Sequence, residues 1–511
     1  MTRRTELILL VSLAMVPFGI TSAIYNASSA EMAGSLGLSA DEASWLNILY
    51  IFAQLAMLPL ASWLSYRIGA VRLLISGAVI GLASTLISSF TITEAAHFLA
   101  WFGHGLTASM MLVAAQVLVL RNLSARDIAY AEGCMLLMTT LLPFGVYPWI
   151  LAELAESSLW QFSFAVQIIF YLVLLAWFWL RPIPYEDEKQ MVKFNLIQAG
   201  LITAAIAGVV FILMRGQFYN WFDSPVIIEA CLITGGLLMY TVAAMQKQWG
   251  QGEYLRSDVL GSRKNIVSMY NGALAGFAVL GTSMLISSYL AGVLKYSHSE
   301  LGWIQIPAFG SMLLGLAVSI WICNHPRLKP DAVIPIGVLM ILISSAFLSG
   351  SNTYSGQSDM WPALILRGFG VGVLNVTVTI YILSSFDKKH LPQGISWFYL
   401  FRTFGGLAGV ALFSRLMSLE ASSVINVLGE NVNATSTTFI HYQNTLAQLL
   451  QNGMLEPTPA RVATLLGKQL QTQTSAIVGI NNFQWFIIAI GVLAPILIIG
   501  KKWAGRANSK E

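Results

Sequence analysis

Charged residues are scarce in this sequence, and their scarcity excludes most water-soluble folds. Of the 511 residues, 10% are Asp, Glu, Lys or Arg, whereas 56% are hydrophobic. Soluble domains typically carry about 25% charged residues. A soluble fold of this composition would expose large apolar patches, which promote association. The composition therefore predicts a protein whose outer surface faces lipid.

Cysteine is also rare, and the sequence lacks the common signatures of soluble chemistry. Cys134, Cys231 and Cys323 are an odd number and lie inside or at the edge of apolar segments. They form no disulfide framework and are expected to pack as small apolar side chains. No group of His and Cys has the spacing of a metal site. No G-x-x-x-x-G-K-[ST] loop is present, which excludes an ATP-driven pump acting by itself.

Long apolar runs are what the sequence has in abundance. A helix needs about 20 such residues to cross the hydrocarbon core of a bilayer. The runs are continuous rather than alternating, which favours helices over the strands of a barrel. The first run follows Arg3 and Arg4, but its length favours an uncleaved helix over a signal peptide. We predict fourteen spanning helices, near residues 6–25, 43–64, 72–92, 96–120, 129–152, 160–180, 196–214, 225–246, 266–292, 302–323, 332–350, 361–384, 393–418 and 482–500.

The positions of Lys and Arg support this count. Basic residues collect in cytoplasmic loops, and with a cytoplasmic N-terminus the fourteen spans place 21 of the 28 on that side. Removing any one span would move every later loop across the membrane and abolish the asymmetry. We therefore predict that both termini are cytoplasmic. The residues assigned to the cytoplasmic side are Arg3, Arg4, Arg67, Arg72, Arg121, Arg126, Arg181, Lys189, Lys193, Lys247, Arg256, Arg263, Lys264, Arg327, Lys329, Lys388, Lys389, Lys501, Lys502, Arg506 and Lys510.

Several short segments resemble one transporter family. Residues 61–73, Ala-Ser-Trp-Leu-Ser-Tyr-Arg-Ile-Gly-Ala-Val-Arg-Leu, join the second and third predicted helices. They resemble the short basic loop motif of the major facilitator superfamily, in the form seen in EmrB/QacA-type drug:proton antiporters, which have fourteen helices. Residues 41–45 resemble the start of the second helix of that family, and Arg402-Thr403 with Gly405 resembles its helix 13. Residues 439–486 resemble its long outer loop.

The resemblance covers nearly the whole chain and implies an all-α polytopic membrane protein with the major facilitator fold. Two six-helix bundles, 1–181 and 266–511, are expected to face each other, with two inserted helices in 182–265. The long outer loop, 419–481, belongs to the second bundle. It holds two amphipathic stretches, the clearer one after Pro459, and this one either packs on its own domain or meets a partner.

The function implied by the resemblance is proton-coupled export of small amphipathic compounds. The two bundles would rock around a site near the bilayer midplane, driven by a proton gradient and without a cofactor. The implied location is the bacterial cytoplasmic (inner) membrane. The implied partners are a small-molecule substrate, the lipid bilayer, a periplasmic membrane-fusion adaptor and an outer-membrane channel, but no nucleic acid. Two alternatives remain open: an uptake permease for a metabolite or siderophore, and a membrane sensor that has lost transport.

The chain also departs from the family pattern, and the departures bear on the substrate. Gly19 and Thr21 stand where the family commonly has Asp-x-Thr, and His104 takes the place of a Gln that follows an Arg in the family. A cation needs a carboxylate partner in a cavity of low dielectric, whereas an anion needs a guanidinium. Because the central acid is missing and Arg367 and Arg402 are present, we expect a neutral or anionic amphipathic substrate.

Ionisable residues inside the spans are candidates for substrate binding or coupling, because they are costly in lipid. These are His104, Glu132, Arg367 and Arg402. A hydrogen-bonded core histidine, a carboxylate at a helix start and a structural arginine are the alternative interpretations. Arg415 is expected to reach the interface.

Neutral polar residues in the spans either line the pathway or bond between helices; these are Asn26, Asn47, Gln54, Gln116, Asn271 and Asn375. Arg67, Gly69 and Arg72 form a predicted gating loop, in which the glycine suits a tight turn. Glycines 368, 370 and 372, and the pair Gly405 and Gly409, are expected to let helices approach closely.

Overall fold

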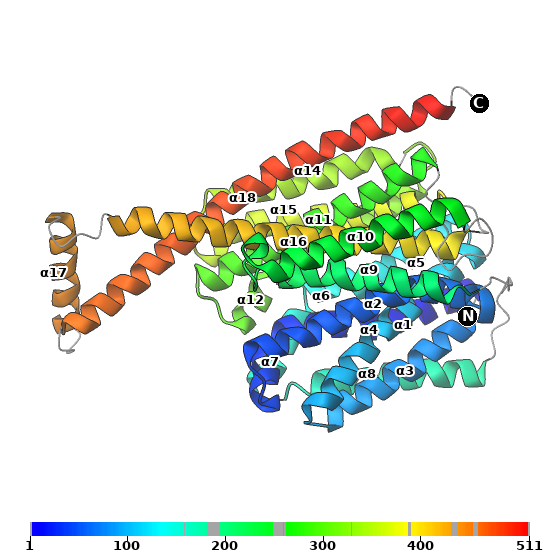
Figure 1. The fold of residues 1–511 in the computed structure, drawn as a ribbon, viewed down its shortest axis with the longest axis horizontal. Coiled ribbons are helices and arrows are strands. Elements are labelled where there is room, and N and C mark those ends of the chain that lie inside the picture. The colour runs from blue at the N-terminus through cyan, green and yellow to red at the C-terminus, as the bar shows by residue number, and fades with distance from the viewer. Residues whose placement is uncertain are drawn as a thin grey trace.

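The computed structural model describes residues 3–157, 159–181, 194–248, 259, 262–328, 330–386, 390–430, 437–452 and 458–508, and within these ranges the regular structure is entirely helical. Some basic residues assigned above to the cytoplasmic side lie outside the described residues: Lys189, Lys193, Arg256, Lys329, Lys388, Lys389 and Lys510. Both chain termini lie at one end of the molecule, hereafter the terminal end, and the opposite end is called the distal end (Figure 1).

The helices follow one another in an up-and-down order, which short connections between long apolar segments favour. They are α1 (Arg3–Leu36), α2 (Ala40–Ile68), α3 (Ala70–Phe90), α4 (Glu94–Asn122), α5 (Ala125–Leu136), η1 (Leu137–Leu141), α6 (Leu142–Phe144), α7 (Tyr147–Glu156), α8 (Phe162–Leu180), α9 (Leu196–Arg215), η2 (Trp221–Asp223), α10 (Pro225–Gln248), α11 (Arg263–Gly292), α12 (His298–Ile304), α13 (Ile306–Asn324), α14 (Pro330–Ser349), α15 (Gln357–Leu383), α16 (Leu391–Glu430), α17 (Thr437–Asn452) and α18 (Pro459–Asn508).

The number of membrane crossings agrees with the sequence. Thirteen helices of the described chain are long and apolar enough to span a bilayer, and one bent pair, Ala125–Phe144 with Tyr147–Glu156, brings the number to fourteen. This pair is the predicted fifth span, which bends by 46°. A π-helical turn, η1, precedes Pro143 and Gly145 at the bend. Such turns and prolines interrupt the regular hydrogen bonding of a helix and so cause kinks.

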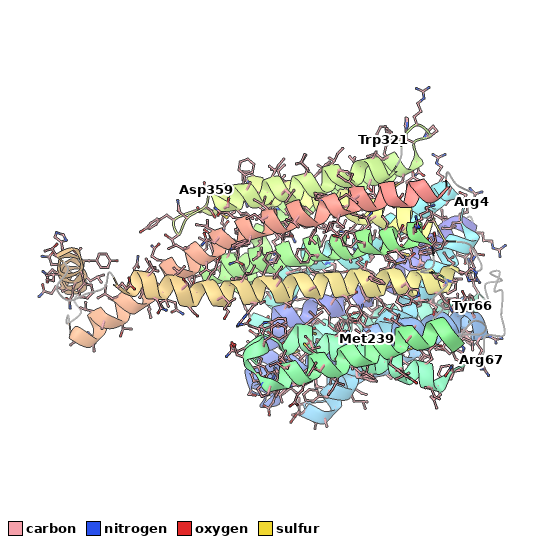
Figure 2. The ribbon with its side chains drawn as sticks, turned by 45° about the horizontal axis from the view of Figure 1, so that its top comes forward. Arg4, Tyr66, Arg67, Met239, Trp321 and Asp359 are labelled. Carbon is pink, nitrogen blue, oxygen red and sulfur yellow. The ribbon has the colours of Figure 1, made fainter. Side chains whose placement is uncertain are left out.

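Burial separates central helices from lipid-facing ones. In α4, 94% of the most apolar stretch is buried, whereas in α10 only 17% is. The residues that α10 exposes are largely apolar, among them Met239, which is 74% exposed and lies on the surface of the bundle in Figure 2. A surface of this kind is stable in lipid and not in water. The structure thus confirms an all-helical, multi-pass membrane protein.

Two pairs of helices meet along glycines, as the sequence indicated. A Cβ atom at Gly405 of α16 would collide with the carbonyl oxygen of Ala273 on α11. A Cβ atom at Gly372 of α15 would collide with the carbonyl oxygen of Met312 on α13. Only glycine therefore permits these backbone contacts, which bring the paired helices close together.

The predicted outer loop 419–481 is largely helical. Helix α16 continues past residue 418 to Glu430, and α18 begins at Pro459 and runs without a break to Asn508. No proline lies between residues 460 and 494 to interrupt it. The amphipathic stretch after Pro459 is therefore the first part of α18 and not a separate surface helix. Helices α16 and α18 project beyond the bundle at the distal end, with α17 between their tips (Figure 1).

Candidate functional site

A buried hydrogen-bonded group joins the first and second halves of the chain. Glu132 of α5 is fully buried, and Gln116 of α4 is 1% exposed. The Gln116 Nε2 donates to Glu132 Oε2 at 3.0 Å and to the Tyr399 hydroxyl of α16 at 2.9 Å. A single amide therefore links an acid in the first half to an aromatic hydroxyl in the second.

Arg402 brings the positive charge to this group. It lies three residues after Tyr399 on α16, a spacing that places the two side chains on one helix face. Its Nη1 donates to Thr379 Oγ1 at 3.3 Å, and its Nη2 donates to Asn375 Oδ1. Asn375 and Thr379 lie four residues apart on α15, so they also share a face. Glu132 and Arg402 interact electrostatically. We call Gln116, Glu132, Asn375, Thr379, Tyr399 and Arg402 the central network.

The network lies well inside the membrane-spanning part of the bundle. Glu132 is seven residues from the start of α5 and Arg402 eleven from the start of α16. At 1.5 Å per residue, these positions lie roughly 10 and 17 Å along the helix axes. The hydrocarbon core is about 30 Å thick, so Arg402 is too deep to reach the interface and must be satisfied internally.

Two acceptor atoms of the network are buried without a partner among the described residues. They are Glu132 Oε1 and Gln116 Oε1. An unsatisfied buried acceptor is costly, and where one occurs a proton, a water molecule or a ligand commonly supplies the missing donor. The network is therefore both charged and incomplete, so its hydrogen bonding can still accept a proton, a water molecule or a ligand.

Arg367 has a different environment from Arg402. It is 3% exposed, and its Nε and Nη2 donate to Thr282 Oγ1 at 3.2 Å and to the Val279 carbonyl at 3.3 Å, both on α11. Its guanidinium also lies 6.0 Å from the ring centroid of Phe144. These contacts fasten α15 to α11, which supports the structural interpretation of this arginine.

His104 lies apart from the central network. Its Nε2 is 3.3 Å from Ser88 Oγ of α3, and its ring stacks on Phe164 of α8 with centroids 5.4 Å apart. Beside it lies a cavity of about 10 Å³, also lined by Thr21 and Tyr50. The structure thus places His104 inside the first group of helices, and its coupling role remains a prediction.

The other candidates do not join the network either. Asn26 is exposed on α1, and Asn47 is partly buried on α2. In the predicted gating loop, Gly69 has φ +93° and ends α2 where α3 begins, a conformation that explains the glycine. Arg67 and Arg72 are exposed, and the Arg67 guanidinium lies 5.2 Å from the centroid of the Trp63 ring. Their roles in gating and in lining the pathway remain predictions.

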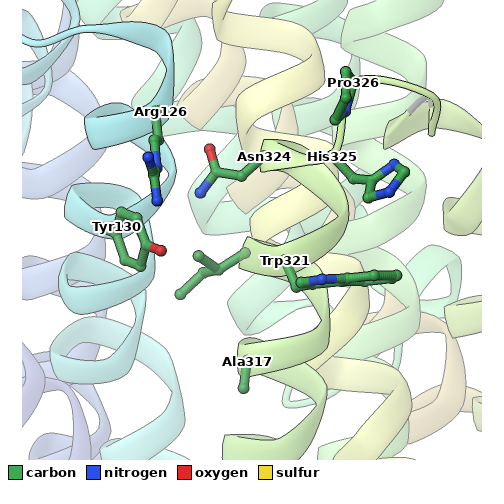
Figure 3. Close-up of a pocket in the computed structure, with 8 residues that line it drawn as sticks. Arg126, Tyr130, Ala317, Trp321, Asn324, His325 and Pro326 are labelled. Atoms are coloured by element: carbon green, nitrogen blue, oxygen red, sulfur yellow. The ribbon is translucent and has the colours of Figure 1, made fainter.

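The two ends of the molecule differ in how the halves meet. At the distal end α7 packs tightly on α12: a Cβ atom at Gly302 would collide with Trp149 Cα, and the rings of Trp149 and Trp303 have centroids 4.7 Å apart. Toward the terminal end a cavity of about 480 Å³ separates α5 from α13 (Figure 3). Toward the terminal end the halves also meet, because Ser396 Oγ of α16 donates to the Leu58 carbonyl of α2 at 2.7 Å. The groove is therefore local to α5 and α13.

Thr379 and Tyr399 are the network residues that sequence reasoning missed. A tyrosine in an apolar helix is ordinary, since its ring packs and its hydroxyl usually finds a partner. The one signal in the sequence was its spacing of three residues from Arg402.

A membrane-spanning helical bundle with a charged, incomplete network buried between its halves has the organisation of a transporter. The chain belongs to the Major Facilitator Superfamily, whose family model matches residues 9–410. It is a transporter of that superfamily and not an enzyme, as the sequence predicted.

Relatives and solved structures agree with this assignment. The chain is 23% identical to the multidrug export protein EmrB of Haemophilus influenzae, over 96% of this chain and 94% of the relative. It is 21% identical to the probable multidrug resistance protein EmrY of Escherichia coli, over 93% and 94%. The proton:xylose symporter XylE has a TM-score of 0.57 at 11% identity, covering 95% of each chain. The human organic anion transporter MFSD10 (TETRAN) has a TM-score of 0.58 at 10% identity, covering 96% of this chain and 99% of that one.

Proposed function

We propose that this protein exports small amphipathic compounds in exchange for protons, by alternating access around the central network. Two relatives are named a multidrug export protein and a probable multidrug resistance protein, and these names support drug export as the function. The observation that carries the proposal is the unpartnered Glu132 Oε1, buried beside Arg402 and Gln116 at the junction of the two halves. When the two halves rock, an ionisable group at their junction becomes accessible first from one side of the membrane and then from the other.

The free oxygen of Glu132 offers a direct way to couple the two fluxes. The ionised carboxylate accepts either a proton or a hydrogen bond from an N–H or O–H group of the substrate. Because the two compete for one atom, substrate binding displaces the proton, which is the requirement of an antiporter. After the proton leaves, the positive charge of Arg402 stabilises the carboxylate of Glu132, since opposite charges attract strongly in a medium of low dielectric.

An anionic substrate would reverse the sign of coupling. Its carboxylate or phosphate would compete with Glu132 for Arg402, so it would bind best when Glu132 carries a proton. Substrate and proton would then move in the same direction. A neutral amphiphile with a hydrogen-bond donor therefore fits export best, and the direction of proton movement distinguishes the two classes.

The moving parts of the proposed cycle are the two six-helix bundles, 1–181 and 266–511, with 182–265 carrying the inserted α9 and α10. The proposed location is the bacterial inner membrane with both termini in the cytoplasm, as the distribution of Lys and Arg predicts. The groove between α5 and α13 would then face the cytoplasmic side, and the packed α7 and α12 the periplasm.

The test uses purified protein in liposomes that hold a pH-sensitive dye, with neutral, acidic and cationic amphiphiles added one at a time outside. We expect neutral amphiphiles to make the interior more alkaline, because each molecule that enters displaces a proton outward. Glu132→Gln should abolish this signal while the protein remains folded. The matched control is Glu94→Gln, which removes an exposed carboxylate at the start of α4.

Two results would contradict the proposal. Interior acidification by every transported compound would show co-transport, as in an uptake permease. Undiminished proton movement in Glu132→Gln would exclude Glu132 as the coupling group, and loss of movement in His104→Gln alone would assign coupling to His104.

We further propose that the projecting parts of α16 and α18, with α17 at their tips, bind a periplasmic membrane-fusion adaptor that leads to an outer-membrane channel. This region lies beyond the bundle at the distal end (Figure 1), and α17 exposes Ile440 and Tyr442 by 43% and 41%. A photo-crosslinking residue at position 440 should capture a protein identified as such an adaptor in native membranes. The control position is Met239, on the lipid-facing side. Equal capture at both positions would contradict the assignment.

A further inference from the structure

The groove at the terminal end is far larger than the cavity beside His104, and neither the central network nor the proposed cycle uses it. It has a volume of about 480 Å³. One wall is formed by Arg126 and Tyr130 of α5, and the other by Ile320, Trp321 and Asn324 of α13. Each of the two facing helices belongs to a different half of the chain.

The polar side chains that line the groove are Arg126, Tyr130, Asn324 and His325. Each of them can donate a hydrogen bond, and Arg126 adds a positive charge. Figure 3 shows Arg126 and Asn324 pointing into the gap from opposite walls, with Tyr130 below them. Asn324 Nδ2 is buried without a partner among the described residues. The nearest carboxylate in sequence, Asp127, is already engaged by Ser124 at 2.6 Å and by Arg4 at 3.4 Å. The described lining contains no carboxylate. Its guanidinium, amide N–H and phenol therefore favour the binding of an anion.

Apart from His325, the remaining lining is apolar and lies near the end of a spanning helix. Ala317 and Ile320 continue the wall of α13 away from the terminal end. Trp321 is 59% exposed and Tyr130 44% exposed. Exposed Trp and Tyr near helix ends mark the interface between hydrocarbon and water. The groove therefore offers cationic and polar groups at headgroup depth and an apolar wall directly beside them.

The groove ends where α5 and α13 touch. A Cβ atom at Gly133 would lie 2.5 Å from Ile320 Cδ1, so the helices are in contact one turn beyond Tyr130. Gly133 directly follows Glu132 in the chain. An occupant of the groove is consequently held outside the central network in this conformation, and it lies between the two halves that must move.

From this geometry we infer that the groove is a binding site for an anionic phospholipid of the surrounding bilayer. The phosphate contacts Arg126 and Asn324, and an acyl chain lies along Ile320 and Trp321. The inference goes beyond the proposed function and does not require transport. A lipid is favoured over a free anion because an acyl chain would bury the apolar wall of the groove, which is favourable. An inorganic ion would leave that wall exposed.

The test measures binding without any gradient, so that it can fail while proton-coupled export stands, or hold while export fails. The full-length protein is placed in nanodiscs of phosphatidylcholine with a trace of phosphatidylglycerol that carries a photoactivatable acyl chain. Crosslinked residues are identified by mass spectrometry. We expect labelling of α5 and α13 beside the groove. Photoactivatable phosphatidylcholine should label these positions much less.

Two variants keep the test sharp. Arg126→Gln removes the charge and should lower this labelling about tenfold, as expected for the loss of a charge-assisted hydrogen bond. Asn324→Leu should lower it less, and both proteins are checked for an unchanged melting temperature. The control is Arg327→Gln, which removes an exposed arginine just past α13 that does not line the groove.

Three outcomes would overturn the inference. The first is equal labelling by the two lipids. The second is labelling that Arg126→Gln leaves unchanged, or that Arg327→Gln lowers equally, because general surface charge would then explain it. The third is displacement of the lipid by millimolar inorganic phosphate, which would assign the groove to a free anion.

Discussion

At the residue scale, Arg402 supplies the positive charge of the central network. Its two hydrogen bonds to α15 hold the guanidinium at a fixed place, and its charge acts on Glu132. The sequence pointed to both residues because charges inside apolar helices are costly and therefore rarely incidental. It also named Gln116 and Asn375 as residues that line a pathway or bond between helices, and the structure shows both in hydrogen bonds between helices.

Replacing Arg402 should change which compounds are transported. Arg402→Gln removes the positive charge while keeping a donor, so we expect transport of acidic amphiphiles to fall about tenfold relative to neutral ones. Arg402→Lys should retain part of the transport of acidic compounds, since a lysine keeps the charge without the planar fork. Uptake of paired acidic and neutral compounds into liposomes measures this ratio. An unchanged ratio in Arg402→Gln would exclude a substrate role.

Adding a single methyl group at Gly405 tests how closely α16 and α11 pack. Gly405→Ala places a methyl group against the Ala273 carbonyl and must separate α16 from α11. We expect a cost of about 1–3 kcal/mol, as for other overpacked sites, seen as a lower melting temperature in detergent. Gly200→Ala is the matched control, because no heavy atom of a neighbouring residue lies within 4 Å of the place its added methyl group would take. Equal melting temperatures for the two variants would contradict the close approach.

At the element scale, the inserted helices α9 and α10 are fastened to both halves of the molecule. Arg215 at the end of α9 bonds to Asp41 of α2 at 2.5 Å, and its guanidinium lies 3.9 Å from the centroid of the Phe218 ring. Asp223 in η2, between α9 and α10, pairs with Arg415 of α16 at 3.5 Å. Arg415 was expected to reach the interface, and this exposed pair is consistent with that position.

The two ion pairs should differ in strength. The Arg215 side chain is 5% exposed and Asp41 is 40% exposed, so Asp41→Asn leaves a buried charge without its counter-ion and should cost about 1–3 kcal/mol. Arg415 and Asp223 are 24% and 75% exposed, so Asp223→Asn should cost less than about 1 kcal/mol. Melting temperatures of the two variants test this order. A larger loss of stability in Asp223→Asn than in Asp41→Asn would contradict the predicted order of the two ion pairs.

The bent fifth span and the long last helices show where patterns along the chain mislead. Residues 129–152 are largely apolar, and apolarity alone does not reveal a 46° bend. Pro143, Gly145 and Pro148 marked a weak point, but whether the helix continues, bends or ends there depends on its packing against α1 and α12. In the same way, the polar residues after 418 predicted a loop. A helix that is surrounded by solvent can nevertheless form without an apolar face, as α16 does beyond residue 418.

At the scale of the whole molecule, alternating access requires α7 and α12 to separate. Ser299 Oγ of α12 lies 3.5 Å from Glu153 Oε2 of α7. A protein with cysteines at positions 153 and 299, and with Cys134, Cys231 and Cys323 replaced, should form a disulfide under oxidation. We expect transport to stop and to return on reduction, because the distal end could no longer open.

The single variant Ser299→Cys, oxidised in the same way, is the control and should transport normally. Continued transport by the crosslinked double variant would show that the distal end does not open during the cycle. The same experiment separates the transporter from a membrane sensor, since a sensor shows no transport before oxidation.

The sequence by itself determined the class of protein and the number of candidate membrane crossings, and it singled out the charged residues that lie inside apolar helices. It could do so because the cost of polar groups in hydrocarbon acts on each residue separately and is visible in composition and run length. The tertiary structure decided which of those charges meet. It placed Gln116 in hydrogen bonds with both Glu132 and Tyr399, and it brought Arg402 close enough to interact electrostatically with these two residues. It left His104 and Arg367 in separate surroundings. Such meetings depend on the rotation and packing of helices far apart in the chain, which no local pattern specifies.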